Sequence, residues 1–263
     1  MKNITDFARA HREGRPSVMV TAYDAAMAKI VAQSAVDAIL VGDSAAMVVH
    51  GLPSPVHATE EMMVLHTAAV RRGAPERVVV SDMPFMTFRR GPAEAVRVAG
   101  ALLQAGATAV KLEGVTGHEE VVAHLVGSGI PVMGHLGLTP QSVHQLGGYK
   151  LQGRSASEAT RLRAEAVRLT ELGIFSLVLE CIPAALAAEI SSDLAVPTIG
   201  IGAGGGCAGQ ILVLNDLLGL DADFRPKFSR RYFDGHGTLL AALNDYARDV
   251  RSAGFPAREE ILA

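Results

Sequence analysis

The sequence contains little of what marks a secreted, membrane-spanning or nucleic-acid-binding protein. Only two cysteines occur in 263 residues, Cys181 and Cys207, and their spacing matches no metal or redox motif, so we expect free thiols in a reducing compartment. The chain has no Trp, a net charge of −3 and no basic run, so we expect no nucleic-acid partner. It contains neither a run of about 18 apolar residues nor an N-terminal signal-peptide segment, so we expect a cytoplasmic protein that does not act on membranes.

What the sequence does contain is a regular alternation of short apolar segments with helical patterns. Apolar residues make up 49% of the chain and charged residues 19%, which is enough for a large core. Eight apolar segments are predicted to be strands: residues 16–21, 38–43, 78–82, 108–114, 131–135, 176–180, 197–202 and 210–216. This pattern predicts an α/β fold, a (β/α)8 TIM barrel, as a single domain over residues 1–263 with a short N-terminal helix and a C-terminal helix at about 236–252.

An open, doubly wound sheet is the alternative fold for such a pattern. A dinucleotide-binding protein of that kind has a Gly-x-Gly-x-x-Gly motif after its first strand, and none follows the first predicted strand here. The glycine-rich segment 200–205 instead follows the seventh strand, which is a frequent position for phosphate or substrate contacts in barrels. The barrel is therefore the better interpretation.

Three carboxylates stand at the ends of neighbouring predicted strands. Asp43, Asp82 and Glu113 end the second, third and fourth strands, so a barrel would place them along one arc of its carboxyl-end mouth, where barrel active sites are built. Taken singly, each is more simply a helix N-cap or a surface carboxylate. Three hard oxygen ligands on adjacent strands favour a Mg²⁺ site instead.

Lys111 lies two residues before Glu113, so the two side chains share one face of the strand. It could bind a substrate carboxylate or form a Schiff base, and an ion pair with one of the acids is compatible with either role. Because a metal would already polarise a substrate carbonyl, an ionic role is favoured over Schiff-base chemistry.

Two further strand ends carry groups suited to proton transfer. Glu180 ends the sixth strand, across the barrel from the metal arc, where a base that removes an α-proton would stand; a purely structural role is the alternative. His135 ends the fifth strand and could donate to a substrate carboxylate or to a developing enolate oxygen, or be a satisfied structural residue. The polar segment 137–154 after that strand is long enough to predict a functional loop.

At these residues the chain resembles the ketopantoate hydroxymethyltransferase family. Ten motifs appear in the family's order and cover nearly the whole chain: Thr21–Asp24, Val41–Ser44, His66–Gly73, Asp82–Met86, Val110–Gly114, Gly134–Ser142, Gly147–Gly153, Leu179–Pro183, Gly200–Gly204 and Pro226–Phe228. Ten motifs in order are far more specific than any one of them.

The resemblance implies a barrel that assembles as a homodecamer of two stacked pentameric rings. It also implies transfer of a hydroxymethyl group from 5,10-methylenetetrahydrofolate to 3-methyl-2-oxobutanoate, giving 2-dehydropantoate in pantothenate and coenzyme A synthesis. The implied Mg²⁺ ligands, one ion per subunit, are Asp43, Asp82 and Glu113. The implied contacts to the oxo acid are Asp43, Ser44, Asp82, Lys111 and His135, and the implied proton acceptor is Glu180.

Two departures from the family pattern occur, at Pro55–Ala58 and at Ala208; both lie outside the metal and base motifs, so they put loop packing or folate affinity in question rather than the chemistry. Two other functions remain open. One is a Mg²⁺-dependent carbon–carbon lyase or mutase of the phosphoenolpyruvate mutase/isocitrate lyase type, which usually needs a reactive cysteine on a mobile loop, unlike Cys181 beside Glu180. The other is a non-catalytic binding protein, against which the set of acids argues. For the folate site the sequence leaves two candidates open, the loop after the fifth strand and the subunit surface.

Overall fold

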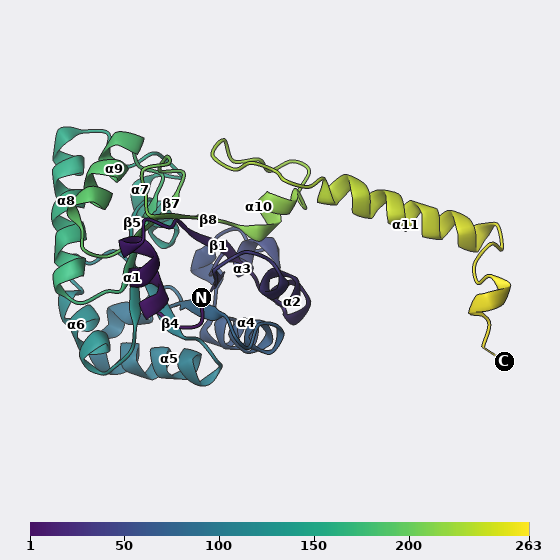
Figure 1. The fold of residues 1–263 in the computed structure, drawn as a ribbon, viewed down its shortest axis with the longest axis horizontal. Helices are drawn as coiled ribbons and strands as arrows, with labels where there is room; N and C mark the ends of the chain where they lie inside the picture. The colour runs from purple at the N-terminus through teal and green to yellow at the C-terminus, as the bar shows by residue number, and fades with distance from the viewer. Residues whose placement is uncertain (263) are drawn as a thin grey trace. The chain divides into compact units, whose positions relative to one another are not determined.

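The computed structural model describes residues 1–262, which fall into two compact units, Met1–Val213 and a second unit that begins at Leu214 (Figure 1). The predicted single domain over residues 1–263 remains a prediction. Within residues 1–262, no helix combines the length and the apolar character needed to cross a bilayer.

The first unit contains eight parallel strands that close into a barrel in chain order, with the last strand hydrogen-bonded to the first. They are β1 (Ser17–Thr21), β2 (Ala38–Val41), β3 (Val78–Asp82), β4 (Ala109–Glu113), β5 (Val132–Gly137), β6 (Ser176–Glu180), β7 (Thr198–Ile201) and β8 (Gly209–Leu212). β2, β3 and β4 are buried along their whole lengths, as expected of parallel strands covered on both faces. The predicted barrel is confirmed.

Helices surround the strands, and local sequence signals start several of them (Figure 1). They are α2 (Ala25–Gln33), α4 (Glu60–Gly73), α5 (Pro92–Gln104), α6 (Glu119–Gly127), α8 (Ala156–Glu171) and α9 (Ala184–Asp193). The Asp24 side chain caps α2 by accepting from the Met27 N–H. Ser155 caps α8 in a reciprocal capping box with Glu158.

An apolar core fills the barrel toward the amino ends of the strands. Phe7 of α1 (Thr5–Arg12) is fully buried there and meets Phe175 edge to face, with ring centroids 5.5 Å apart. The other members of this core are Met19, Ala38, Leu40, Val78, Val80, Ala109, Met133, Val178, Ile199 and Ile211. The amino end of the barrel is therefore closed by packing of uncharged side chains.

The loops at the opposite, carboxyl end carry short helices, here including the 3₁₀ helices labelled η. They are α3 (Ala45–Val48), η1 (Pro55–His57), η2 (Phe88–Arg90), η3 (Pro140–Ser142) and α7 (Val143–Leu146). The segment 137–154, predicted as a loop, thus contains η3 and α7. Gly147 ends α7 in the left-handed conformation, with φ of 68°.

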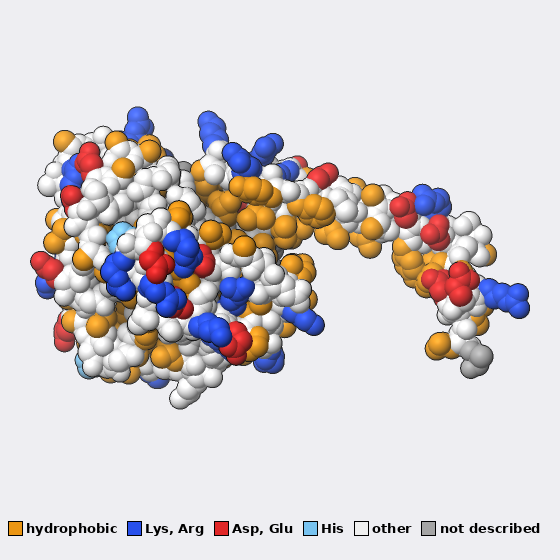
Figure 2. All heavy atoms as spheres, viewed as in Figure 1, with side chains coloured by type: hydrophobic (Ala, Val, Ile, Leu, Met, Phe, Trp, Pro, Cys, Tyr) orange, Lys and Arg blue, Asp and Glu red, His pale blue; other side chains and the backbone are white. Residues whose placement is uncertain are grey.

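The second unit contains α10 (Leu214–Leu218), α11 (Gly235–Arg251) and η4 (Arg258–Glu260). The predicted eighth strand, residues 210–216, is wrong at its end, since β8 pairs with β1 only as far as Leu212 and the chain turns helical at Leu214. α11 agrees with the predicted helix to within one residue at each end. Figure 2 shows apolar side chains along α11. The exposed large apolar residues of this helix are Leu239, Leu240, Leu243, Tyr246 and Val250.

Candidate active site at the carboxyl ends of the strands

Strand register brings the predicted site residues together at the barrel mouth. Asp82 is the register partner of Lys111 on β4, and Glu113 is that of His135 on β5. Because successive parallel strands end at the same side of the barrel, side chains that are far apart in sequence become neighbours here.

Lys111 and Asp82 form a buried ion pair, with 2.7 Å between Nζ and Oδ1 and side chains only 5% and 4% exposed. The Lys111 Nζ also lies 3.2 Å from His135 Nδ1. Although burial opposes it, the charges of Asp82, Glu113 and Asp43 raise the pKa of Lys111 above its usual value. The side chain is therefore an ammonium, which suits ionic binding and not the neutral amine that a Schiff base requires.

His135 connects two carboxylates through its two ring nitrogens. Nδ1 lies 3.5 Å from Glu113 Oε1, and Nε2 lies 3.2 Å from Glu180 Oε2. Burial and the Lys111 charge favour the neutral ring, but the contacts with the carboxylates of Glu113 and Glu180 outweigh them and raise the pKa of His135 to about 9. Glu180, predicted to face the metal acids from across the barrel, is thus linked to Glu113 through one imidazole ring.

Asp43 and Asp82 lie side by side, since the Asp43 N–H donates to Asp82 Oδ2 at 3.0 Å. Burial, and next the charges of Asp82 and Glu113, raise the pKa of Asp43 well above its usual value. Glu113 behaves differently: burial raises its pKa, yet contacts with His135, Lys111 and the Gln141 N–H lower it overall. A single lysine is thus surrounded by three buried carboxylates.

Gln141 of η3 is a central residue that was not predicted as a site residue, although it lies in the long loop and within the motif Gly134–Ser142. Its side-chain amide donates to Asp43 Oδ2 at 2.8 Å and to the Met83 carbonyl at 2.9 Å, while its backbone N–H donates to Glu113 Oε2 at 2.9 Å. Its Oε1 is buried and has no hydrogen-bond partner among the described residues. Gln141 therefore presents a free carbonyl oxygen inside the cluster of acids.

The donor set of this cluster fits Mg²⁺ chemically. Among the described residues, no three His, Cys, Asp or Glu side chains stand close enough together to hold a metal ion by themselves. Mg²⁺ does not require such a cage, because it typically binds one or two carboxylates and completes its octahedron with water and substrate oxygens. Asp43 and Asp82 meet that requirement, because both carboxylates are buried and the Asp43 N–H donates to Asp82 Oδ2.

Ser44 lies shortly after β2 and contacts Tyr23, which was not predicted to be a site residue. The Tyr23 hydroxyl and Ser44 Oγ are 2.9 Å apart, and Tyr23 is buried. Burial raises the pKa of Tyr23, so the phenol stays neutral and can donate. The Tyr23 carbonyl in turn accepts from His66 Nδ1 at 2.6 Å, which fixes this side of the mouth. The only sequence signal was that Tyr23 lies within the motif Thr21–Asp24.

Cys181 is not a reactive thiol. It follows Glu180 directly, with the positive φ of 47°, and burial and the Glu180 charge raise its pKa to about 12. A nucleophilic cysteine requires a lowered pKa. This argues against the lyase alternative, which needs a reactive cysteine on a mobile loop.

The sequence matches the family described as ketopantoate hydroxymethyltransferase over residues 1–258. The chain belongs to this family. It is 48% identical over 260 residues to a 3-methyl-2-oxobutanoate hydroxymethyltransferase of Bdellovibrio bacteriovorus, with 99% of each chain covered. It is 55% identical over 251 residues to the enzyme of that name from a Methylobacterium species, with 95% of this chain and 87% of the relative covered. The predicted family, and with it an enzyme, is confirmed.

Solved structures of more distant proteins share the fold. A 2,3-dimethylmalate lyase of the PEP mutase/isocitrate lyase superfamily superimposes with a TM-score of 0.61 at 17% identity, covering 100% of this chain and 92% of that chain. A phosphonopyruvate hydrolase superimposes with a TM-score of 0.63 at 12% identity, covering 98% and 93%. At such low identity these proteins support the barrel and not a shared reaction.

Proposed function

We propose that the chain transfers a hydroxymethyl group from 5,10-methylenetetrahydrofolate to 3-methyl-2-oxobutanoate, giving 2-dehydropantoate for pantothenate synthesis. The observation that carries this proposal is the connected run Asp82–Lys111–His135–Glu180 at the barrel mouth, in a chain of this family. In this run an ammonium and an imidazole, both suited to an oxo acid, lie beside a candidate base.

The oxo acid is an anion, and the site offers it an ammonium and an imidazole. The Lys111 ammonium and the His135 ring lie 3.2 Å apart and can both face a carboxylate. Ser44, oriented by Tyr23, adds a hydroxyl. We assign these three residues to substrate binding, with Asp43 and Asp82 on the side of the metal.

Asp43 and Asp82 would hold Mg²⁺ directly, and Glu113, the third predicted ligand, would add negative charge nearby, since no three such side chains of the described residues stand close enough together to hold the ion by themselves. When bound, the ion would polarise the 2-oxo group and so acidify C3 of the substrate. Phosphonopyruvate hydrolase, which shares the fold, was crystallised with oxalate and Mg²⁺. Oxalate is a small dicarboxylate and resembles a 2-oxo acid.

Glu180 is assigned as the base. Its carboxylate is partly exposed, and the His135 Nε2 contact at 3.2 Å orients it. Glu180 takes the C3 proton, and C3 then forms a bond to the one-carbon unit. Both bonds from that carbon to the folate nitrogens break, one water supplies the hydroxyl oxygen and its two protons go to those nitrogens. The proton removed from C3 ends on the new hydroxyl group, so the atoms balance.

The proposal is tested by separating proton removal from transfer. In D₂O with Mg²⁺ and 3-methyl-2-oxobutanoate but no folate, we expect exchange of the C3 proton, observed by NMR. Addition of 5,10-methylenetetrahydrofolate should then yield 2-dehydropantoate. Absence of both reactions, or carbon–carbon cleavage without transfer, would rule the proposal out.

We also propose that the chain works as a homo-oligomer, the decamer that the resemblance implies. α11 supports this, because Leu239, Leu243, Tyr246 and Val250 are exposed at helical spacing along it (Figure 2). Sedimentation equilibrium should give ten chain masses for the wild type. A Leu243→Glu variant should give a smaller species, and an unchanged mass would count against a role of α11 in assembly.

A further inference from the structure

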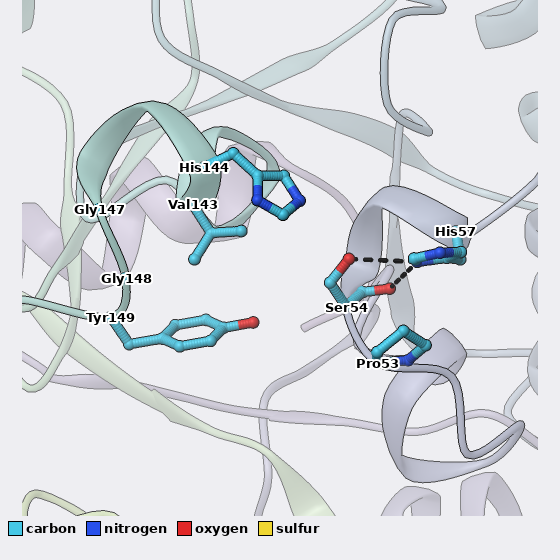
Figure 3. Close-up of a pocket in the computed structure, with 8 residues that line it drawn as sticks. All are labelled: Pro53, Ser54, His57, Val143, His144, Gly147, Gly148 and Tyr149. Atoms are coloured by element: carbon cyan, nitrogen blue, oxygen red, sulfur yellow. Dashed lines mark hydrogen bonds between the residues drawn. The ribbon is translucent and has the colours of Figure 1, made fainter.

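A pocket of about 370 Å³ opens between two loops at the carboxyl end of the barrel (Figure 3). Pro53, Ser54 and His57 line it on one side, from the segment after β2. The segment after β5 lines the other side with Val143, His144, Gly147, Gly148 and Tyr149. The two segments are in contact, since η1 packs against η3. The volume lies in the range of small-molecule sites.

The pocket adjoins the acid cluster through the same loop. Gln141, two residues before the lining residue Val143, hydrogen-bonds both Asp43 and Glu113. The Tyr149 hydroxyl contacts Met47 Sδ at 3.8 Å, and Met47 lies on α3, which follows Asp43 in the chain. A ligand in the pocket would therefore stand next to whatever the acid cluster binds.

Electrostatic interactions also indicate that the pocket lies close to the acid cluster. Burial, and then the charges of Asp43, Glu180 and Glu113, raise the pKa of Tyr149. The phenol therefore lies within electrostatic reach of the carboxylates at the mouth.

The lining of the pocket suits a flat, neutral ring with polar edges. Figure 3 shows the Tyr149 ring along one side, its hydroxyl directed across the space toward Ser54 and Pro53. His144 is exposed beside it, and the Ser54 hydroxyl lies 3.2 Å from His57 Nδ1. None of the eight described lining residues is Lys, Arg, Asp or Glu. An oxo acid, which needs a cation for its carboxylate, fits the Lys111 side of the site better.

Two glycines, Gly147 and Gly148, line the side of the pocket that the segment after β5 forms, and they expose its backbone to the pocket. Gly148 has φ of 110°, and a Cβ there would meet nothing within 4 Å, so its backbone conformation rather than crowding favours glycine. A Cβ at Gly147 would lie 3.2 Å from Lys150 Nζ, so that ammonium stands against the same wall. Lys150 is exposed, and its Nζ places a positive charge beside the lining residue Gly147.

We propose that this pocket binds the reduced pterin ring of the one-carbon donor, stacked on Tyr149, with Lys150 facing the carboxylates of the donor's glutamate tail. The inference rests on the proposed function. The enolate carbon must approach the donated carbon to about 3–3.5 Å before the new bond forms. Since the oxo acid occupies the buried cluster of charges, its partner has to approach from the loops, where this pocket lies.

The first test compares two sources of the one-carbon unit. Free formaldehyde can react with the enolate without any pterin, so it bypasses the pocket. We expect Tyr149→Ala to lower kcat/KM for 5,10-methylenetetrahydrofolate about tenfold more than it lowers the formaldehyde-driven rate. Tyr149→Phe keeps the ring and should recover most of the loss. Leu151→Ala, an exposed residue of the same loop outside the pocket, is the matched control and should change neither rate.

The second test separates ring from tail by equilibrium dialysis. Tyr149→Ala should weaken binding of both tetrahydrofolate and the tail-less 6-methyltetrahydropterin. Lys150→Gln should weaken tetrahydrofolate severalfold, more at low salt than at high salt, and leave 6-methyltetrahydropterin unchanged. Equal effects of Lys150→Gln on the two probes would overturn the assignment of the tail.

A wrong assignment of the pocket and a wrong proposed function would give different results in these tests. If the wild type makes 2-dehydropantoate from both one-carbon sources, but Tyr149→Ala changes the two rates in equal proportion or not at all, the pocket does not bind the donor. If the wild type makes it from neither source, the proposed function itself is wrong.

Discussion

The two ends of the barrel each contain an ion pair, and the pairs differ in their surroundings. At the carboxyl end, Lys111 and Asp82 are 2.7 Å apart with side chains 5% and 4% exposed. Beside the amino end, Arg15 and Asp37 are 3.1 Å apart with side chains 45% and 16% exposed. Removing charges from water costs several kcal/mol per ion, and a buried pair often does no more than offset this cost. Stability alone therefore does not account for the charges at the mouth.

The contrast extends to the neighbours of each pair. The barrel interior toward the amino end is filled with apolar side chains around Phe7. At the mouth the same strands present carboxylates, an ammonium and an imidazole to one another. One end of the barrel therefore serves packing, and we expect substitutions at the other end to affect catalysis far more than folding.

The largest effect is expected for Glu180→Gln. Loss of a general base typically slows proton transfer by about 10²–10⁴-fold, so folate-free exchange of the C3 proton should fall by this factor. The side chain is 15% exposed and contacts His135, so we expect the variant to unfold at nearly the wild-type temperature. Exchange at the wild-type rate would show that another group takes the proton.

Asp82→Asn should lower hydroxymethyl transfer on the order of 10²–10³-fold, because it removes a charge from the metal and substrate side of the site. In this variant the Lys111 ammonium still has the negative charges of Asp43 and Glu113 close to it, so the variant should remain folded. Turnover in saturating Mg²⁺ and thermal unfolding measure the two properties separately. Normal turnover would exclude Asp82 from the metal site.

Ile199→Val tests the apolar end. Ile199 is fully buried, and removal of one methylene group should reduce the free energy of unfolding by about 0.5–1.5 kcal/mol. Denaturant titration measures this loss, and KM for both substrates should stay unchanged in the folded variant. A large change in kcat would mean that the two ends of the barrel are more closely coupled than their side chains suggest.

The smallest effect is expected for Arg15→Ala at the exposed ion pair. Such pairs contribute less than about 1 kcal/mol, and salt screens them. The difference in unfolding free energy from the wild type should therefore shrink further as NaCl is added. A loss of several kcal/mol that persists in high salt would contradict the contrast between the two pairs.

Sequence reasoning succeeded where the signal was local. Strands, helices and the carboxylates that end strands can be recognised from residues close together in the chain, as at Asp82 and Glu113. It failed at the end of β8, because the strand stops where its pairing with β1 stops, at Leu212. It also missed Gln141, whose amide meets Asp43 across 98 positions of sequence. The motif Gly134–Ser142 includes Gln141, but no local pattern assigns this side chain a role that the other polar residues of the loop lack.

By itself, the sequence determined the barrel and the placement of its acids at strand ends, because alternating apolar segments and helical patterns allow few other arrangements. Only the tertiary structure decided which of the charges meet. Strand register sets Asp82 against Lys111 and Glu113 against His135, and the loop after β5 folds back over the acids. Closure of the barrel thus produces pairings between distant residues that no local pattern in the chain contains.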